Sequence, residues 1–272
     1  MTMRVAAIWR YPVKSLGGQE VPSAAIEARG VAHDRRWMVT TPEGRFLTRR
    51  ELPAMAHIHA APVIGAGIVL SHRDGTSLAV PVPDNAPLVQ VRVWGDHVAA
   101  HDAGDPAAQW LSALLGQAVR LVHLPDGVRR PVADGEVTDH VSFADGFPLL
   151  VTVTASLDAL NRELASPIPM ARFRPNLVIE GAPGAFAEDG WQRLQIGNVS
   201  VRVVRPCTRC VITTQDVDTG EVIDRLEPLR TLRAMGRVMP GEGKLREPIF
   251  GRNAIPDGLG TIAVGDVVAI IA

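Results

Sequence analysis

The residues best suited to chemistry are the chain's two cysteines, Cys207 and Cys210, which stand in a Cys-x-x-Cys turn after an apolar run. Two interpretations of this turn require partners that the sequence does not supply. A structural zinc site takes about four ligands, and the nearest other candidates, His123 and His140, are distant and form no His-x-x-x-His pair. A thioredoxin-like redox pair begins a helix, whereas the β-branched residues 211–214 predict a strand.

Two further interpretations need only the turn itself. Free cysteine is commonly a small buried side chain, although Arg209 argues against this for Cys210, because a neighbouring positive charge favours the thiolate. Alternatively, one thiolate binds a soft metal that a cofactor already holds, so that the cofactor supplies the other ligands. A cofactor with a phosphate and a flat heterocycle then requires cations and bidentate hydrogen-bonding groups elsewhere in the chain.

Side chains suited to such a cofactor occur at three places before the cysteines. Lys14 follows a strand-like entry, Arg35 lies before the aromatic start of a strand, and Arg174 and Asn176 precede the apolar run 177–179. Each is weak evidence alone, since lysine and arginine are mostly exposed surface residues. Together they predict a pocket with positive charge.

The composition indicates a soluble globular protein and argues against several classes of partner. Of the 272 residues, 46% are hydrophobic and 21% are charged, and 28 basic residues balance 29 acidic ones. Without net positive charge, the chain has no overall field that would attract nucleic acid or an anionic membrane. No stretch approaches the roughly 20 apolar residues of a membrane span, and the N-terminus lacks the apolar core of a secretory signal. We therefore expect a cytoplasmic protein.

Short alternating segments between Gly and Asp turns predict a strand-rich fold. Predicted strands include 91–94, 199–203 and 261–264, and predicted helices cover 105–116, 154–164 and 227–236. Asp105 before Pro106 is read as a helix N-cap, and Gly116 as its stop. Because many short strands must hide their edges, the expected fold is α+β, mostly β, with two β-barrel-like domains and a few short helices. A Gly/Pro-rich segment after residue 125 predicts a division into 1–125 and 126–272.

The order of these segments resembles the MOSC family, the domain type related to the C-terminal part of molybdenum-cofactor sulfurases. The resemblance covers nearly the whole chain, through YPVKSLGG, DRRWMV, LTRRELP and HDAGDPAAQWLS, then FRPNLVIEG, FAEDGWQRLQIG, PCTRCVITTQDVDTGE and GTIAVGDVV. It is greatest for the two-part form found in bacterial and mitochondrial amidoxime-reducing proteins. The resemblance implies an N-terminal MOSC-associated β-barrel domain at 1–125 and a MOSC domain at 126–272.

Proteins of this family bind a pyranopterin molybdenum cofactor, Mo-molybdopterin, in which the cofactor supplies two sulfurs and one cysteine binds the metal. The resemblance implies that Cys210 is the catalytic metal ligand and that Cys207 is a packed structural neighbour. The cofactor-binding residues that it implies are Lys14, Arg35, Asp145, Arg174, Asn176, Thr208, Arg209 and Asn253. Thr48 and Arg50 are further candidates for the pocket or for the domain interface.

The activity implied by the resemblance is reduction of N-hydroxylated substrates, such as amidoximes and N-hydroxylated bases. Electrons would come from a separate donor protein: a ferredoxin, a flavodoxin or a reductase. Asp145 and Asp216 are candidates for proton transfer. The alternative is a module that carries molybdenum cofactor or sulfur without turnover, and a third class is a detoxifying protein for thiolated or heterocyclic compounds. No nucleic-acid or membrane partner is expected.

Overall fold

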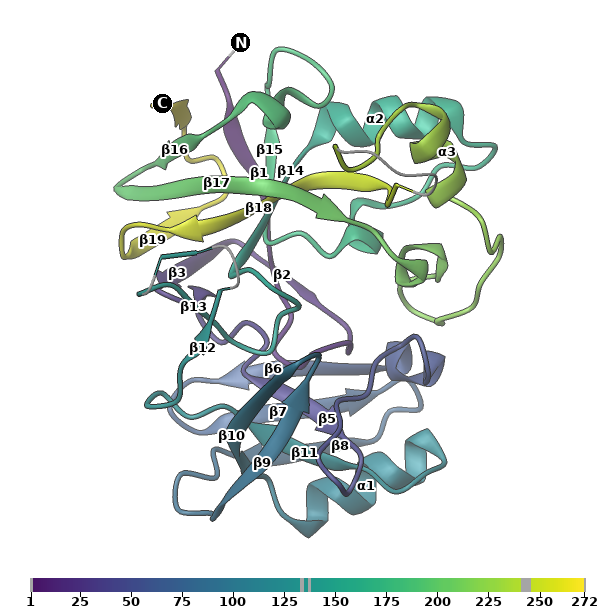
Figure 1. The fold of residues 1–272 in the computed structure, drawn as a ribbon. Helices are drawn as coiled ribbons and strands as arrows, with labels where there is room; N and C mark the ends of the chain where they lie inside the picture. The colour runs from purple at the N-terminus through teal and green to yellow at the C-terminus, as the bar shows by residue number, and fades with distance from the viewer. Residues whose placement is uncertain (1, 133–134, 137, 241–245, 272) are drawn as a thin grey trace.

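The computed structural model describes residues 2–132, 135–136, 138–240 and 246–271, and it is mostly strand (Figure 1). This confirms the expected α+β, mostly β fold. The α-helices of these ranges are α1 (Asp105–Leu115), α2 (Thr154–Glu163) and α3 (Leu229–Ala234), and the short 3-10 helices are η1 (Pro53–His57), η2 (Met170–Phe173), η3 (Ala187–Gly190) and η4 (Val211–Thr214). Within the described ranges, no helix is both long enough and apolar enough to cross a membrane.

An eight-stranded sheet forms the upper part of the molecule in Figure 1. Its strands, in spatial order, are β2 (Gln19–Val21), β1 (Arg4–Arg10), β15 (Leu177–Glu180), β14 (Leu149–Val153), β18 (Ile249–Pro256), β17 (Val199–Thr208), β16 (Arg193–Ile196) and β20 (Val268–Ile270). Strands β14 and β15 run parallel, which requires the crossover that α2 supplies. Alternate residues of β17, such as Val199 and Val201, point into a buried apolar core.

The lower part of the molecule is built from smaller antiparallel sheets and α1 (Figure 1). One sheet has the order β5 (Trp37–Thr40), β11 (Arg120–His123), β10 (Asp96–Asp102), β9 (Leu88–Val93), and another has β6 (Ile58–Val63), β7 (Gly67–His72), β8 (Ser77–Pro81). A second core lies here, where Leu111 and Leu115 of α1 pack among buried residues such as Val39 and Leu70. The amphipathic spacing of the α1 leucines accounts for this packing.

The first strands of the chain pair with strands of its second half. Strand β1 is antiparallel to β15, and β3 (Ser23–Glu27) lies between β4 (Gly30–Val31) and β19 (Gly260–Ala263). A small hairpin-like pair, β12 (Arg130–Pro131) with β13 (His140–Val141), lies near the predicted division. The division into 1–125 and 126–272 stays a prediction, and β1 to β4 show that the two halves share sheets.

Three local predictions around the helices and the cysteines are wrong. Residues 211–214 form η4 rather than a strand, and β17 does not stop before Pro206 but continues to Thr208. Its register shifts on both sides of Pro206, which is where a residue without an N–H donor is tolerated in a sheet. The N-cap of α1 is Gly104 and not Asp105, because the chain enters the helix at a φ of 88°, a conformation that favours glycine.

Candidate active site

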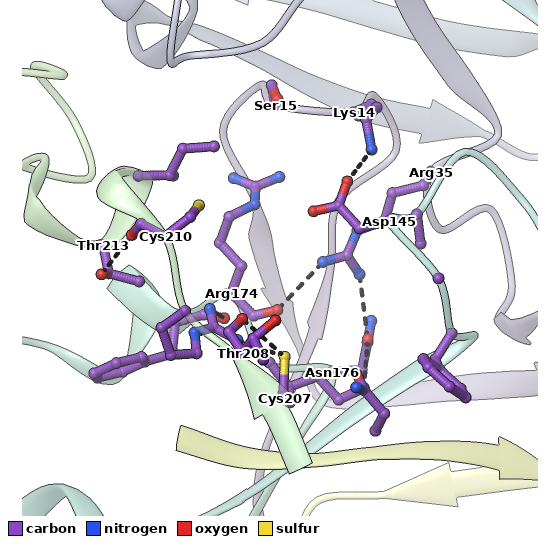
Figure 2. A pocket seen from close by; sticks show the side chains of 18 of the residues that line it. Lys14, Ser15, Arg35, Asp145, Arg174, Asn176, Cys207, Thr208, Cys210 and Thr213 are labelled. Atoms are coloured by element: carbon purple, nitrogen blue, oxygen red, sulfur yellow. Dashed lines mark hydrogen bonds and ion pairs between the residues drawn. The ribbon is translucent and has the colours of Figure 1, made fainter. Parts of the chain in front are cut away.

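A single cavity collects the candidate residues from distant parts of the chain. It has a volume of about 510 Å³, within the range typical of small-molecule sites. All nine candidates, Cys210 and the eight expected cofactor-binding residues, line it, as do Thr48, Arg50 and Cys207. Figure 2 shows lining side chains around one space, and those that it labels are carried by the N-terminal segments, the loop before β14, the segment after η2, the end of β17, and the cysteine turn with η4.

The charge of the cavity wall is one-sided. The cations that line it are Lys14, Arg35, Arg50, Arg172, Arg174, Arg205 and Arg209, whereas the acidic residues among the described lining residues are Asp145 and Glu247. Lys14 forms an ion pair with Asp145, and Arg35 forms one with Asp34. The excess of basic over acidic residues in the wall favours an anionic ligand.

Lys14 and Asp145 bring the two halves of the chain together at one side of the cavity. The Lys14 ammonium is buried, donates to the Phe143 carbonyl oxygen over 2.9 Å and forms an ion pair with Asp145 (Figure 2). Partial loss of hydration raises the pKa of Asp145, but the charge and hydrogen bond of Lys14 outweigh it and hold the pKa well below its usual range. Trp94, on the turn between β9 and β10, also donates its ring N–H to this carboxylate over 3.2 Å.

Arg35 and Arg174 both pack against one buried aromatic ring, that of Tyr11. Their guanidinium carbons lie 4.2 Å and 4.1 Å from the ring centre of Tyr11, the cation–π distance range. Burial, together with the positive charges of Arg49 and Arg35, lowers the pKa of Arg174 from 12.5 to about 9. Arg174 donates to the Leu16 carbonyl oxygen over 2.8 Å but has no ion-pair partner among the described residues.

Asn176 connects Arg35 to the backbone of two neighbouring strands. Its side-chain oxygen accepts from Arg35 over 3.2 Å and from the Leu150 backbone N–H over 3.1 Å, and its amide nitrogen donates to the Trp9 carbonyl oxygen. The residue is 2% exposed, so most of its hydrogen-bonding capacity is used within the protein. Asn176 therefore orients Arg35 rather than offering a free amide to a ligand.

Cys210 is contacted from the other half of the chain by Arg50. The Arg50 Nη2 atom lies 3.1 Å from the Cys210 sulfur, and its guanidinium carbon lies 5.0 Å from the ring centre of Trp94. On the carbonyl side of Cys210, the Thr213 hydroxyl donates to the Cys210 oxygen over 2.9 Å and fixes η4 behind it. A cationic hydrogen-bond donor therefore lies beside the sulfur that is expected to bind the metal.

Cys207 is not the packed neighbour that was expected. It is half-buried, lines the cavity and accepts from Arg209 Nη1 over 2.8 Å. Arg209 also donates to the Phe173 carbonyl oxygen over 2.6 Å, while its buried Nε has no partner in the described part of the chain. Both cysteines are free thiols. No group of three or more His, Cys, Asp or Glu residues that could hold a metal occurs among the described residues, so the zinc interpretation has no ligand set.

Ser15, Trp94 and Arg172 are among the lining residues that the structure adds and the sequence did not indicate. Ser15 follows Lys14, Trp94 begins the hairpin turn after β9, and Arg172 lies in η2. Ser15 adjoins a predicted site residue, so proximity was the available signal. Trp94 and Arg172 reach the cavity only through tertiary contacts. Asp216, proposed above for proton transfer, does not line the cavity, because its carboxylate accepts the backbone N–H groups of Asp218 and Thr219 in a turn.

The donor set fits an anionic, flat cofactor bound through one thiolate. Arg174 and Arg209 present cationic groups without carboxylate partners in the described residues, and Arg209 retains an unpartnered buried Nε. Guanidinium groups match phosphate in a bidentate manner. A single cysteine sulfur suffices for a soft metal whose other ligands come with the cofactor.

Comparison with known proteins places this site in a family. The model of the MOSC N-terminal beta barrel domain matches residues 2–118, and that of the MOSC domain matches residues 138–269. The chain is 39% identical to mitochondrial amidoxime-reducing component 1 of Mus musculus and 37% identical to that of Homo sapiens, in each case over 98% of this chain and 82% of the relative. It is 35% identical to mitochondrial amidoxime reducing component 2 of Homo sapiens, over 97% of this chain and 82% of the relative.

The names of these relatives contradict the cytoplasmic location expected from the sequence, since all three are called mitochondrial. That expectation depended on the lack of a secretory signal and of an apolar membrane span, two features that do not distinguish the cytoplasm from the mitochondrion. The two matching domains and the similarity over nearly the whole chain agree with the resemblance seen in the sequence. The chain belongs to the MOSC-domain family, in the form that joins a MOSC N-terminal β-barrel domain to a MOSC domain.

Proposed function

We propose that the protein is a molybdenum-cofactor-dependent reductase of N-hydroxylated compounds, amidoximes among them, with a separate protein as electron donor. The observation that supports this best is the position of Cys210, whose thiol lines a cation-rich cavity in a chain 39% identical to an amidoxime-reducing component. In the net reaction, two electrons and two protons convert an N–OH group into an N–H group and one molecule of water.

Different residues of the cavity would bind the metal, the phosphate and the pterin of the cofactor. When bound, the pyranopterin molybdenum cofactor supplies the two-electron centre for removing an oxygen atom. Cys210 would contribute the one protein sulfur, and Lys14, Arg35 and Arg174 would neutralise the phosphate. Thr208, Arg209 and Asn253 lie at the end of β17 and in β18 beside Cys210, and would meet the remaining polar edge of the pterin.

The chain's own groups set the protonation states around the site. The Arg50 guanidinium lies 3.1 Å from the Cys210 sulfur. Asp145 is ionised at neutral pH because Lys14 holds its pKa well below the usual range. A proton donor works best when its pKa lies near the working pH, so Asp145 is suited to fixing Lys14 and Trp94 rather than to transferring protons. Asp216 is committed to its turn.

The proposal is tested by comparing Cys210→Ala with Cys207→Ala in protein produced in a host that makes molybdenum cofactor. Molybdenum and pterin content are measured first, and then oxidation of a reduced donor on addition of benzamidoxime. We expect Cys210→Ala to lower the turnover rate at least a hundredfold and to perturb the metal centre, because the remaining thiol, Cys207, is engaged by Arg209. Cys207→Ala should retain turnover within about threefold. Equal tolerance of both substitutions would refute the ligand assignment.

The same preparation distinguishes an enzyme from a carrier. Wild-type protein that contains molybdenum and pterin, yet oxidises none of several reduced donors in the presence of N-hydroxylated substrates, would favour the carrier of cofactor or sulfur. Turnover with any donor favours the reductase.

A further inference from the structure

One cation of the cavity wall has no assigned ligand in the proposed site. Arg172 lies in η2, two residues before Arg174, and lines the same cavity. Its Nε is buried without a partner, and its side chain forms no ion pair with any described residue. The guanidinium therefore has no neutralising partner among the described residues, and its residue belongs to the cavity wall.

The acidic group whose charge acts on Arg172 is already engaged. Asp216 is the charged residue that acts on Arg172 electrostatically, but its Oδ1 accepts from the backbone N–H groups of Asp218 and Thr219, each over 3.0 Å, and from the Thr219 hydroxyl over 3.2 Å. These three bonds hold the carboxylate in the turn after η4. Asp216 therefore makes the electrostatic potential at Arg172 less positive, but it forms no ion pair with the Arg172 guanidinium.

Arg172 lies on the Cys210 side of the cavity. Its helix η2 packs against η4, which begins at the residue after Cys210. Lys14 and Asp145, in contrast, bond each other at the side formed by the N-terminal segment and the loop before β14 (Figure 2). A molecule that reaches Cys210 would therefore lie against the same part of the cavity wall as Arg172.

We propose that Arg172 forms an anion subsite beside Cys210 that takes a carboxylate or phosphate group of the N-hydroxylated substrate. This rests on the proposed reductase function and narrows its substrate class to compounds that carry a compact anion as well as the N–OH group. The subsite gives a role to Arg172, a cation of the wall that is not assigned to the cofactor. The substrate anion would also supply a hydrogen-bond acceptor for the Arg172 side chain, which has none among the described residues.

The test uses the holoenzyme and two matched substrate pairs. The first pair is benzamidoxime and 4-carboxybenzamidoxime, and the second is N4-hydroxycytidine and its 5′-monophosphate, so that carboxylate and phosphate are examined separately. The quantity measured is the ratio of kcat/KM for the anionic member to that for the neutral member. Wild type is compared with Arg172→Met, Arg172→Lys and Arg129→Met, since Arg129 is exposed and does not line the cavity.

A charged hydrogen bond contributes about 1.5–3 kcal/mol, which corresponds to a factor of ten or more in affinity. We therefore expect Arg172→Met to lower the ratio at least tenfold for one or both pairs and Arg172→Lys to keep part of it. Arg129→Met should leave the ratio within twofold. The wild-type preference should also weaken as salt is raised.

Three outcomes would overturn the subsite. An unchanged ratio in Arg172→Met, with both substrates still reduced, would show that Arg172 does not meet the substrate anion. An equal loss in Arg129→Met would assign the preference to long-range charge. A fall in molybdenum and pterin content in Arg172→Met would assign the residue to the cofactor. Failure of wild type to reduce any of the four compounds would instead count against the reductase function itself.

Discussion

Replacing Arg174 by methionine should stabilise the cofactor-free protein while removing its capacity to hold the cofactor. Arg174 keeps its charge at neutral pH, although burial and the charges of Arg49 and Arg35 lower its pKa from 12.5 to about 9. The folded chain therefore contains a guanidinium in an environment that disfavours the charge. A bound anion relieves this, and so does removal of the charge. Methionine keeps similar length and apolar bulk without the charge.

The size of the effect follows from opposing contributions. Each pKa unit corresponds to about 1.4 kcal/mol, so a fall from 12.5 to about 9 corresponds to roughly 5 kcal/mol against the charged form. Methionine loses the hydrogen bond to the Leu16 carbonyl oxygen and the contact with the Tyr11 ring, which together contribute about 3 kcal/mol. The net gain is about 2 kcal/mol, or about 4–8 °C in Tm for a chain of this size.

The assay is thermal unfolding of cofactor-free protein at pH 7, together with pterin and molybdenum content after production in a host that makes the cofactor. Arg120→Met is the control with the opposite sign, because Asp102 and Asp105 stabilise that guanidinium and raise its pKa. We expect Arg174→Met to unfold at higher temperature than wild type and Arg120→Met at lower temperature. A lower Tm in Arg174→Met would refute the reasoning that an uncompensated charge destabilises the cavity.

Three further substitutions test how other buried or paired polar groups contribute to the free energy of unfolding. Burial raises the pKa of Glu188 to about 7, above the unfolded value of about 4.3, so its contribution to stability is present below pH 4.3 and lost as the pH rises through 7. Urea unfolding should find Glu188→Gln equal to wild type at pH 4 but more stable by roughly 3 kcal/mol at pH 8.5, and a difference independent of pH would contradict this. Asp145→Asn should destabilise by about 1 kcal/mol at pH 7, since the Asp145 side chain is 63% exposed and its pair with Lys14 is screened by solvent. Because its pKa is lowered in the folded state, that difference should shrink below pH 4, and a constant difference would count against the ion pair. The Tyr11 hydroxyl is buried without a partner in the described residues, so Tyr11→Phe should raise the free energy of unfolding by about 1 kcal/mol, whereas a loss would reveal a hidden acceptor.

The sequence contains enough local information to predict the helices and part of the site. Gly116 ends α1 in the left-handed conformation as expected, and Arg174 and Asn176 emerge together before β15 because the apolar run that follows them forms a buried strand. Such features depend on neighbouring residues. Trp94 and Arg172 could not be predicted in this way, because their positions at the cavity depend on contacts between segments far apart in the chain.

The segment after the cysteines shows why β propensity failed. Residues 211–214 are β-branched and read as a strand, yet two hydroxyl groups bond backbone oxygens three residues earlier: Thr213 bonds Cys210, and Thr214 bonds Val211 over 2.8 Å. Threonine side chains compete with sheet pairing by bonding the local backbone in this way. The turn that they form places Cys210 at the cavity. Local hydrogen bonding therefore outweighs the β propensity of residues 211–214.

The environment of the Cys210 sulfur depends on contacts that cross between the halves of the chain. Asp145 of the second half holds the Trp94 ring N–H of the first, Trp94 lies against Arg50, and Arg50 returns to the Cys210 sulfur of the second half. Each link is a single polar or cation–π contact, which separately contributes about 1 kcal/mol. Every link is needed to keep the Arg50 guanidinium at the Cys210 sulfur, so neither half of the chain can place this positive charge beside the thiol alone. The strands β1 to β4, which pair with strands of the second half, hold the two halves at the separation that these contacts require.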